Sequence, residues 1–306
     1  MSGIPHYRGR FAPSPTGPLH FGSLVAALGS YLQARSSGGE WLVRIEDLDP
    51  PREIAGAADA ILFTLDHLGL EWDGPVVYQS TRQHRYREAL DRLDTLGVLY
   101  PCSCSRSEIA ARASPGTEGW IYPGTCRNRT AVGKHLALRT RTHNDPIAFI
   151  DTIQGEYGQR LETGVGDFVV KRADGLIAYQ LAVVVDDAAQ GITEVVRGSD
   201  LLNATPRQLY LQQLLGFPPP RYAHLPVATN DLGHKLSKQT GAQPLTQGAG
   251  NRYLLEALTF LGQAVSDDLR YATQAEILRW AVDHWDLHRV PRSSGLVWHP
   301  PEAWSR

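Results

Sequence analysis

Residues 13–23 read PSPTGPLHFGS, a turn rich in proline and glycine that leads directly into an apolar-periodic segment. The preceding residues 7–12 predict a strand, and residues 20–35 predict a helix because Leu24, Leu28 and Leu32 recur every four positions. Glycine lets a backbone approach a ligand closely, and the first turn of a helix offers unpaired N–H groups with a partial positive charge. The stretch therefore predicts a strand–turn–helix unit that binds a phosphate group, with His20 as a donor at its entrance.

The alternation of strand and helix continues along the chain. Residues 41–45 predict a strand, and residues 53–68 predict a helix whose apolar face is formed by Ile54, Ala58, Ile61 and Leu65. Such a rhythm is typical of an α/β protein with a doubly wound parallel sheet. The remaining expected elements are helices at 82–96, 180–189, 206–215, 277–285 and from Asn251 onward, a strand at 193–197, and a β-rich segment at 134–171.

The bulk composition limits the class of protein. A net charge of −2 argues against a wholly basic nucleic-acid binder, although local arginine clusters can still contact phosphates. The chain has no apolar run of about 18 residues and no charged N-terminal region followed by an apolar stretch. We therefore expect a cytoplasmic protein of one large or two modest domains, without a membrane segment.

A second signature lies about 215 residues after the first, where residues 235–238 read KLSK. Lysine is otherwise scarce in this arginine-rich chain, and glycines flank the motif at Gly233 and Gly241. A flexible loop that carries two ammonium groups can close over a triphosphate and stabilise charge in a transition state. Taken alone, such a tetrapeptide is usually a solvated basic turn, so the prediction depends on its pairing with the first signature.

Together the two signatures resemble the ATP-handling motifs of class I aminoacyl-tRNA synthetases, usually written HIGH and KMSKS. The segments RFAPSPTG (10–17), RIEDLDPPR (44–52) and KLSK resemble those of glutamyl-tRNA synthetases over most of the chain. The stretch after residue 245 is too short for the large anticodon-binding domain of those enzymes. The profile, with AVVVDD (182–187) and KLSKQ (235–239), is closer to the truncated glutamyl-Q tRNA(Asp) synthetase family. Ser23 and Leu236 depart from the two motifs, but the imidazole, the glycine and both lysines remain.

The resemblance implies a Rossmann-type catalytic domain with a doubly wound parallel sheet, an inserted zinc-bearing subdomain and a short helical C-terminal region. We expect the first half of the catalytic domain at 1–100 and the zinc-bearing, β-rich insertion at 101–175. The second half, with the KLSK loop, would occupy 176–245, and the helical region 246–306. No anticodon-binding domain is expected.

The resemblance also implies a reaction: L-glutamate is activated by ATP with Mg²⁺ and transferred to the queuosine base of the tRNA(Asp) anticodon. His20, Lys235 and Lys238 would stabilise the developing charge, and His20, Gly22, Leu236 and Lys238 would bind ATP. The expected partners are ATP, L-glutamate and queuosine-containing tRNA(Asp), bound by a monomer. Two alternatives stay open: a truncated glutamyl-tRNA synthetase that charges the 3′ end of tRNA(Glu), and an inactive paralogue that binds amino acid or nucleotide.

A glutamate ligand needs cations for its two carboxylates and an anion for its ammonium group. Arg10 and Arg197 are the candidate carboxylate clamps, because a guanidinium binds carboxylate in a bidentate fork. Glu46 is the candidate partner of the ammonium group, and Tyr179 and Ser14 are candidate hydrogen-bond donors. The alternatives are structural ion pairs, Arg10 with Asp47 or Glu46 with Arg44, and a tyrosine buried in an apolar cluster.

All three cysteines, Cys102, Cys104 and Cys126, lie within 25 residues. Three thiolates are one ligand short of tetrahedral zinc, and reduced thiols in a cytosolic protein are the alternative. Zinc-bearing members of the resembled family complete the site with a tyrosine four residues before the last cysteine, a position that Tyr122 matches. We expect one structural zinc ion. The candidate arginines for contact with tRNA phosphates are Arg82, Arg85, Arg127, Arg129, Arg139 and Arg141.

Overall fold

The computed structural model describes residues 6–129, 133, 135–236, 243–246 and 248–300. Its helices are α1 (Phe21–Ser36), α2 (Ala57–His67), α3 (Gln83–Thr95), α4 (Arg106–Ala110), α5 (Leu161–Gly164), α6 (Tyr179–Gln190), α7 (Thr205–Leu215), α8 (Gly250–Phe260) and α9 (Gln274–His284). Its strands are β1 (Arg8–Phe11), β2 (Glu40–Ile45), β3 (Val77–Tyr78), β4 (Leu99–Cys102), β5 (Pro115–Gly116), β6 (Gly119–Trp120), β7 (Ala137–Thr140), β8 (Pro146–Asp151), β9 (Gly155–Arg160), β10 (Phe168–Lys171), β11 (Glu194–Gly198), β12 (Arg221–Leu225), β13 (Val227–Thr229) and β14 (Gly295–Val297).

A parallel arrangement of strands forms the centre of the molecule. One sheet has the order β1-β2-β3 and another the order β11-β12-β8-β9, with only β9 antiparallel to its neighbour. The two sheets meet where the amide of Thr193 donates to the carbonyl of Arg8 over 2.9 Å. The α/β fold with a parallel sheet, expected from the strand–helix rhythm, is therefore confirmed.

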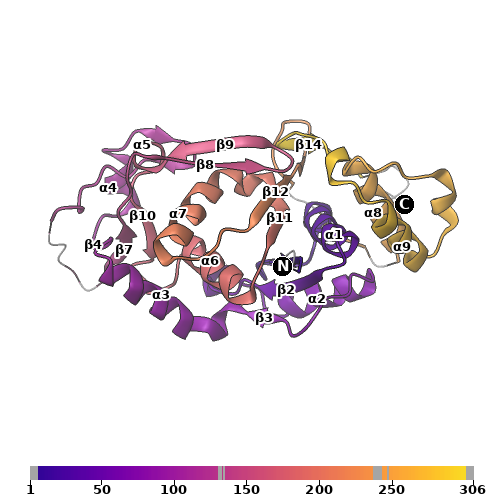
Figure 1. Cartoon of the computed structure of the whole chain (residues 1–306), viewed down its shortest axis with the longest axis horizontal. Coiled ribbons are helices and arrows are strands. Elements are labelled where there is room, and N and C mark those ends of the chain that lie inside the picture. Colours follow the sequence, from indigo (N-terminus) through magenta and orange to yellow (C-terminus); the bar gives the residue numbers. More distant parts are fainter. Residues whose placement is uncertain (1–5, 130–132, 134, 237–242, 247, 301–306) are drawn as a thin grey trace, which may run out of the picture.

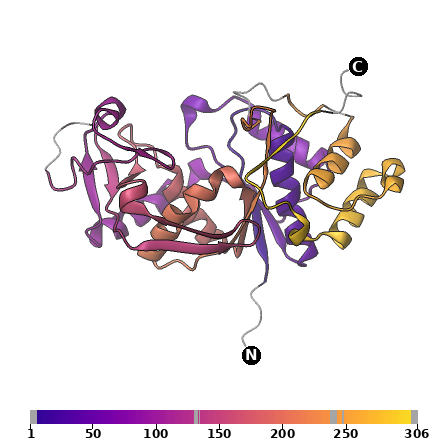
Figure 2. The same cartoon turned by 90° about the horizontal axis from the view of Figure 1, so that it is seen from above.

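Successive residues of a strand point to opposite faces of a sheet, so both faces of the central strands have side chains to bury. Helices cover both faces. Val43, Val196 and Ala223 belong to a core shared with α1, α8 and α9. Val195 and Tyr222 belong to a separate small cluster with Ile192, and α3, α6 and α7 form a further core. Figures 1 and 2 show α8 and α9 at one end of the molecule and β4, β7 and β10 at the other. None of the helices described is long and apolar enough to cross a membrane.

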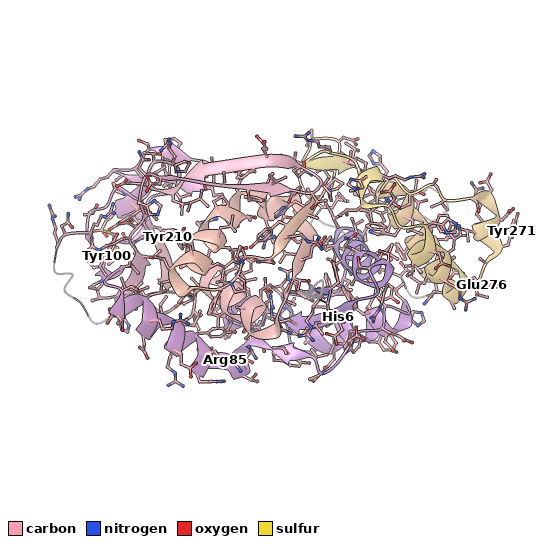
Figure 3. All side chains as sticks on the ribbon, in the orientation of Figure 1. His6, Arg85, Tyr100, Tyr210, Tyr271 and Glu276 are labelled. Atoms are coloured by element: carbon pink, nitrogen blue, oxygen red, sulfur yellow. The ribbon has the colours of Figure 1, made fainter. Side chains whose placement is uncertain are left out.

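Within the segment 101–175, where the insertion was expected, β8 and β9 instead extend the central sheet beside β12. The insertion itself is the antiparallel sheet of β4, β7 and β10. Beside it, β5 and β6 pair as a short hairpin. Figure 3 labels Tyr100 of β4 and Tyr210 of α7 at this end of the molecule, with Tyr271 and Glu276 at the opposite end. The hydroxyl of Tyr210 donates to the carbonyl of Arg141 over 2.6 Å, which ties the insertion to the catalytic body.

Two segments differ from the sequence-based prediction. The helix expected at 53–68 begins only at Ala57, because residues 50–52 form a 3-10 turn and Gly56 has a φ of +76°. Ile54 consequently lies outside the helix and is exposed rather than buried. The C-terminal region, expected to be helical, also contains β14, which pairs in parallel with β13.

Candidate active site

A cavity of about 560 Å³ lies at the carboxyl ends of β1, β2 and β11. This is the edge at which open parallel sheets bind ligands. Both sequence signatures line the cavity: the first through Pro13, Ser14, residues 16–20, Gly22 and Ser23, and the second through Lys235 and Leu236. Arg10, Ser14, Glu46, Tyr179 and Arg197 line it as well, so the structure brings together all the described residues that were predicted to bind glutamate.

The PSPTG turn is held by the backbone of the segment after β2. The amide of Glu46 donates to the carbonyl of Pro13 over 2.9 Å, and the amide of Ile54 donates to that of Pro15 over 3.0 Å. The turn is thereby fixed in front of α1. Residues 13–17 and 44–54 both contain parts of the signature segments. They are far apart in the chain but lie side by side in the structure.

His20 caps the N-terminus of α1. Its Nδ1 accepts a hydrogen bond from the amide of Ser23 over 3.3 Å. In the neutral imidazole the proton therefore resides on Nε2, which makes that nitrogen a donor. Capping of α1 and the predicted binding of phosphate are compatible, because each uses a different ring nitrogen of His20.

Gly22 brings the two signatures into contact. A Cβ atom at this position would lie 3.2 Å from the His20 ring and 3.7 Å from the carbonyl of Leu236. Leu236 is in turn fixed by its amide, which donates to the carbonyl of Ala228 over 2.7 Å. A glycine is needed here because a side chain would press on the His20 imidazole.

The KLSK motif is only partly described. Nζ of Lys235 lies 2.6 Å from a carboxylate oxygen of Asp200, at the rim of the cavity. Ser237 and Lys238 lie outside the described residues, so the predicted role of Lys238 stays a prediction.

Two arginines and an aspartate form a buried charge cluster beneath the cavity. Nε of Arg10 lies 3.2 Å from Oδ1 of Asp187, and Nη2 of Arg44 lies 2.8 Å from the same oxygen. Burial would raise the pKa of Asp187, but the two arginines lower it below its ordinary value. The partner suggested for Arg10 was wrong: Asp47 instead accepts hydrogen bonds from Ser80.

Glu46 completes this cluster. Its carboxylate lies 3.5 Å from Nη2 of Arg44, so the suggested Glu46–Arg44 contact is present. Its Oε1 is nevertheless buried without a hydrogen-bond partner in the described part of the chain. Burial raises the pKa of Glu46 to about 7, even though Arg44 and Arg10 act in the opposite direction. A ligand ammonium group would supply the missing partner and favour the ionised form.

Arg197 lies at the end of β11 and is 5% exposed. Its Nε donates to Nε2 of His224 over 3.0 Å, and its Nη2 donates to Oγ1 of Thr205 over 2.9 Å. The remaining terminal nitrogen, Nη1, is buried and has no hydrogen-bond partner among the described residues. Tyr179 begins α6 nearby, and burial raises the pKa of its hydroxyl, which therefore stays protonated as a donor.

The sequence did not single out Arg44, Asp187, His224 or Asp151 as parts of the site. Asp186 and Asp187 did carry a signal, since two consecutive acids in an apolar helix need buried partners. His224 and Asp151 carried none, because strand pairing alone brings them to Arg197.

The three cysteines form a cluster in the insertion. Their sulfur atoms all lie within 4.8 Å of one another, and Tyr122 places its hydroxyl 3.3 Å from the sulfur of Cys102. Burial would raise the pKa of Cys126, but hydrogen bonds from the Ser103 backbone and from Cys104 lower it to about 7. The three sulfur atoms are close enough together to hold one metal ion.

Four of the six arginines expected at phosphates contact other groups of the chain. Arg139 is buried, and its guanidinium lies 3.7 Å from the centre of the Tyr122 ring, so the expectation is wrong for this residue. Arg82, Arg127 and Arg141 bond to groups of the chain itself, namely Asp186, Glu162 and the carbonyl of Arg127. Arg85 and Arg129 are exposed, and for them phosphate contact stays a prediction.

A parallel sheet with paired phosphate-binding signatures at its carboxyl edge defines a class I tRNA synthetase catalytic domain. The family described as tRNA synthetases class I (E and Q), catalytic domain, matches residues 6–281. A glutamate-tRNA synthetase from Elizabethkingia anophelis has a similar structure, with a TM-score of 0.78 at 25% identity over 96% of this chain and 68% of the other.

The curated relatives narrow the class further. The chain is 59% identical to the glutamyl-Q tRNA(Asp) synthetase of Dechloromonas aromatica, over 95% of this chain and 98% of the relative. It is 55% identical to the protein of that name from Aromatoleum aromaticum, over 94% and 91% of the two chains. The chain belongs to the glutamyl-Q tRNA(Asp) synthetase family.

Proposed function

We propose that this chain activates L-glutamate with ATP and transfers the glutamyl group to the queuosine base in the anticodon of tRNA(Asp). The relatives carry this activity in their names, and they match the chain over nearly its whole length. The observation that carries the proposal is the shared cavity, which His20 and Lys235 line together with Arg10, Glu46 and Arg197. Phosphate-binding and amino-acid-binding groups thus face the same space.

In the first step, an oxygen of the glutamate α-carboxylate attacks the α-phosphorus of ATP in line with the leaving group. The bond to the bridging oxygen breaks, and pyrophosphate leaves as glutamyl-adenylate forms. His20 and Lys235, joined by Lys238, stabilise the charge that develops on the phosphate oxygens. Mg²⁺ bound to ATP would neutralise further phosphate charge. Each reacting group comes from a substrate, so no covalent enzyme intermediate is required.

Glutamate is held at both ends. Arg197 and Arg10 bind the side-chain carboxylate, because the α-carboxylate must stay available to attack the phosphate. Glu46 binds the ammonium group, and Tyr179 and Ser14 donate further hydrogen bonds. In the second step, a hydroxyl of the queuosine cyclopentene diol attacks the adenylate carbonyl carbon and releases AMP.

The cysteine cluster would hold one structural zinc ion through Cys102, Cys104, Cys126 and Tyr122. Zinc would fix the fold of the insertion, which is poor in apolar core residues. The three free thiols also fit a reducing compartment, which supports action in the cytoplasm.

The test of activation is glutamate-dependent exchange of pyrophosphate into ATP without tRNA. We expect exchange in the wild type and a loss on the order of 10²-fold in Lys235→Ala, because a charge-stabilising donor is removed. Lys171→Ala is the matched control, since Lys171 lies on β10 and does not line the cavity. No exchange in the wild type, with or without tRNA, would leave only the inactive paralogue.

The test of transfer is the position of labelled glutamate on tRNA. After incubation with queuosine-containing tRNA(Asp), nuclease cleavage should leave the label on the anticodon fragment. A label on the 3′ fragment of tRNA(Glu) would instead identify a truncated glutamyl-tRNA synthetase, an alternative that the names of the relatives do not favour.

A further inference from the structure

The orientation of Arg197 depends on two buried residues outside the cavity lining. Arg197 of β11 and His224 of β12 are register partners in a parallel pair, and Asp151 ends β8, the next strand. His224 is completely buried, and its Nδ1 lies 2.6 Å from Oδ2 of Asp151. The three side chains thus form a chain of hydrogen bonds across three strands, Asp151 to His224 to Arg197.

The donors and acceptors in this chain have only one consistent assignment. Nε of Arg197 always carries a proton, so Nε2 of His224 must accept. The imidazole proton therefore resides on Nδ1 and is donated to Asp151. Burial lowers the pKa of His224 to about 4, which keeps the ring neutral at physiological pH. A protonated ring would turn an N–H group toward the guanidinium.

Asp151 is itself fixed by the backbone. Its Oδ1 accepts from the amides of Ile153, Gln154 and His224 at 3.0, 2.8 and 3.1 Å. Its Oδ2 is thereby directed at the imidazole. The carboxylate selects the tautomer of His224 that can accept from Arg197.

Arg197 differs from the other arginines at the base of the cavity in the charge of its hydrogen-bond partners. Arg10 and Arg44 both share the carboxylate of Asp187. The hydrogen-bond partners of Arg197 are an imidazole, a hydroxyl and a carbonyl, all neutral. Within the described ranges no carboxylate forms an ion pair with Arg197, so its charge is left for a ligand.

We propose that His224 and Asp151 are positioning residues that orient Arg197 without neutralising it, and that this uncompensated charge selects a carboxylate over an amide in the substrate. The inference rests on the proposed function, in which Arg197 binds the glutamate side chain. This role would account for a histidine at position 224. A carboxylate there would also hold the guanidinium of Arg197, but it would cancel its charge.

Asp151→Asn tests the proposal with an isosteric change. The three backbone amides require the asparagine oxygen at the Oδ1 position, so its NH₂ group must face His224. The ring then has to accept at Nδ1 and carry its proton on Nε2, opposite the Nε–H of Arg197. We expect the KM for glutamate in pyrophosphate exchange to rise at least about tenfold, as for a buried donor left unsatisfied. The KM for ATP should stay near the wild-type value, and the preference for glutamate over glutamine should fall.

Two further variants separate positioning from general stability. His224→Gln keeps an acceptor for Arg197 and should be closer to the wild type than Asp151→Asn. Asp167→Asn is the matched control, because Asp167 is also buried and accepts from a backbone amide, that of Thr142, but lies in the insertion. It should leave the KM for glutamate and the preference for glutamate over glutamine unchanged.

The tautomer can be measured without any activity. Long-range ¹H–¹⁵N spectra of histidine-labelled protein should show Nδ1 of His224 protonated in the wild type and Nε2 protonated in Asp151→Asn, with His224→Gln providing the assignment. A wild type that does not activate glutamate would overturn the proposed function and the substrate preference with it. An active wild type whose Asp151→Asn variant keeps its tautomer, its KM and its preference for glutamate would overturn this inference alone.

Discussion

A single carboxyl group, that of Glu46, connects the electrostatics of the empty pocket to the pH dependence of the reaction. Burial raises its pKa to about 7, so below that pH the carboxyl in the empty pocket is protonated. A protonated carboxyl cannot pair with the ammonium group of glutamate. Binding below pH 7 must therefore first remove a proton from Glu46, whereas binding above pH 7 need not.

We predict that kcat/KM for glutamate falls as pH decreases through about 7, approaching tenfold per pH unit in the acid limb. Pyrophosphate exchange between pH 5.5 and 8.5 measures this profile. Glu46→Gln should bind glutamate weakly and lose the acid limb of the pH profile. Any pH dependence that comes from the ionisation of ATP is the same for both proteins. Asp47→Asn is the control, because Asp47 bonds to Ser80 and does not line the cavity. A Glu46→Gln variant that retained the acid limb would contradict the assignment.

At the scale of single elements, β14 links the end of the described chain to both signatures. It pairs with β13, and the amide of Trp298 donates to the carbonyl of Thr229, which forms an isolated bridge with Lys235. The Trp298 ring stacks on Phe21 in the first turn of α1, with ring centres 3.8 Å apart. β14 and the residue that follows it, Trp298, therefore support α1, the helix proposed to bind phosphate, and the start of the KLSK motif.

We predict that Trp298→Ala raises the KM for ATP several-fold and lowers the melting temperature, because a stacked aromatic pair contributes about 0.5–1.5 kcal/mol beyond its buried area. The KM for glutamate should change less. Trp298→Phe should restore most of the loss, because it keeps a stacking ring. Trp120→Ala offers the same substitution on the exposed β6 strand and should leave both constants unchanged. Equal effects of the two alanine variants would argue against a role for β14.

The helices and strands also differ in how well the sequence predicts them. The helices α1, α3, α6 and α7 were predicted to within one residue at each end, because their apolar periodicity is a local property. β14 was not predicted, since a three-residue strand has too little pattern and depends on a partner 68 residues away. The hydrogen-bond chain from Asp151 to Arg197 was missed for the same reason. Signature residues such as His20 and Arg10 were found because a motif fixes their neighbours.

Over the whole molecule, the cavity and the cysteine cluster lie in separate units. Neither the three cysteines nor Tyr122 lines the cavity. The insertion joins the rest of the chain through partly buried polar contacts, including the ion pair of Glu118 with Arg207 on α7 and the bond from Gln159 of β9, in the central sheet, to Thr117 over 2.7 Å. These contacts fix the position of the insertion, but they do not pass through the groups proposed to bind glutamate or ATP.

Loss of zinc should therefore separate the two steps of the proposed reaction. We predict that chelation, or Cys102→Ser with Cys104→Ser, removes one zinc ion per chain and lowers the stability of the insertion. Glutamate-dependent exchange without tRNA should remain within about threefold of the wild type, since no group of the cavity is touched, while transfer to tRNA(Asp) should fall at least about tenfold. Metal analysis, exchange and transfer assays on the same samples measure all three. Readdition of zinc after chelation controls for irreversible damage. A parallel loss of exchange and transfer would contradict the prediction and show that the insertion also maintains the shape of the cavity.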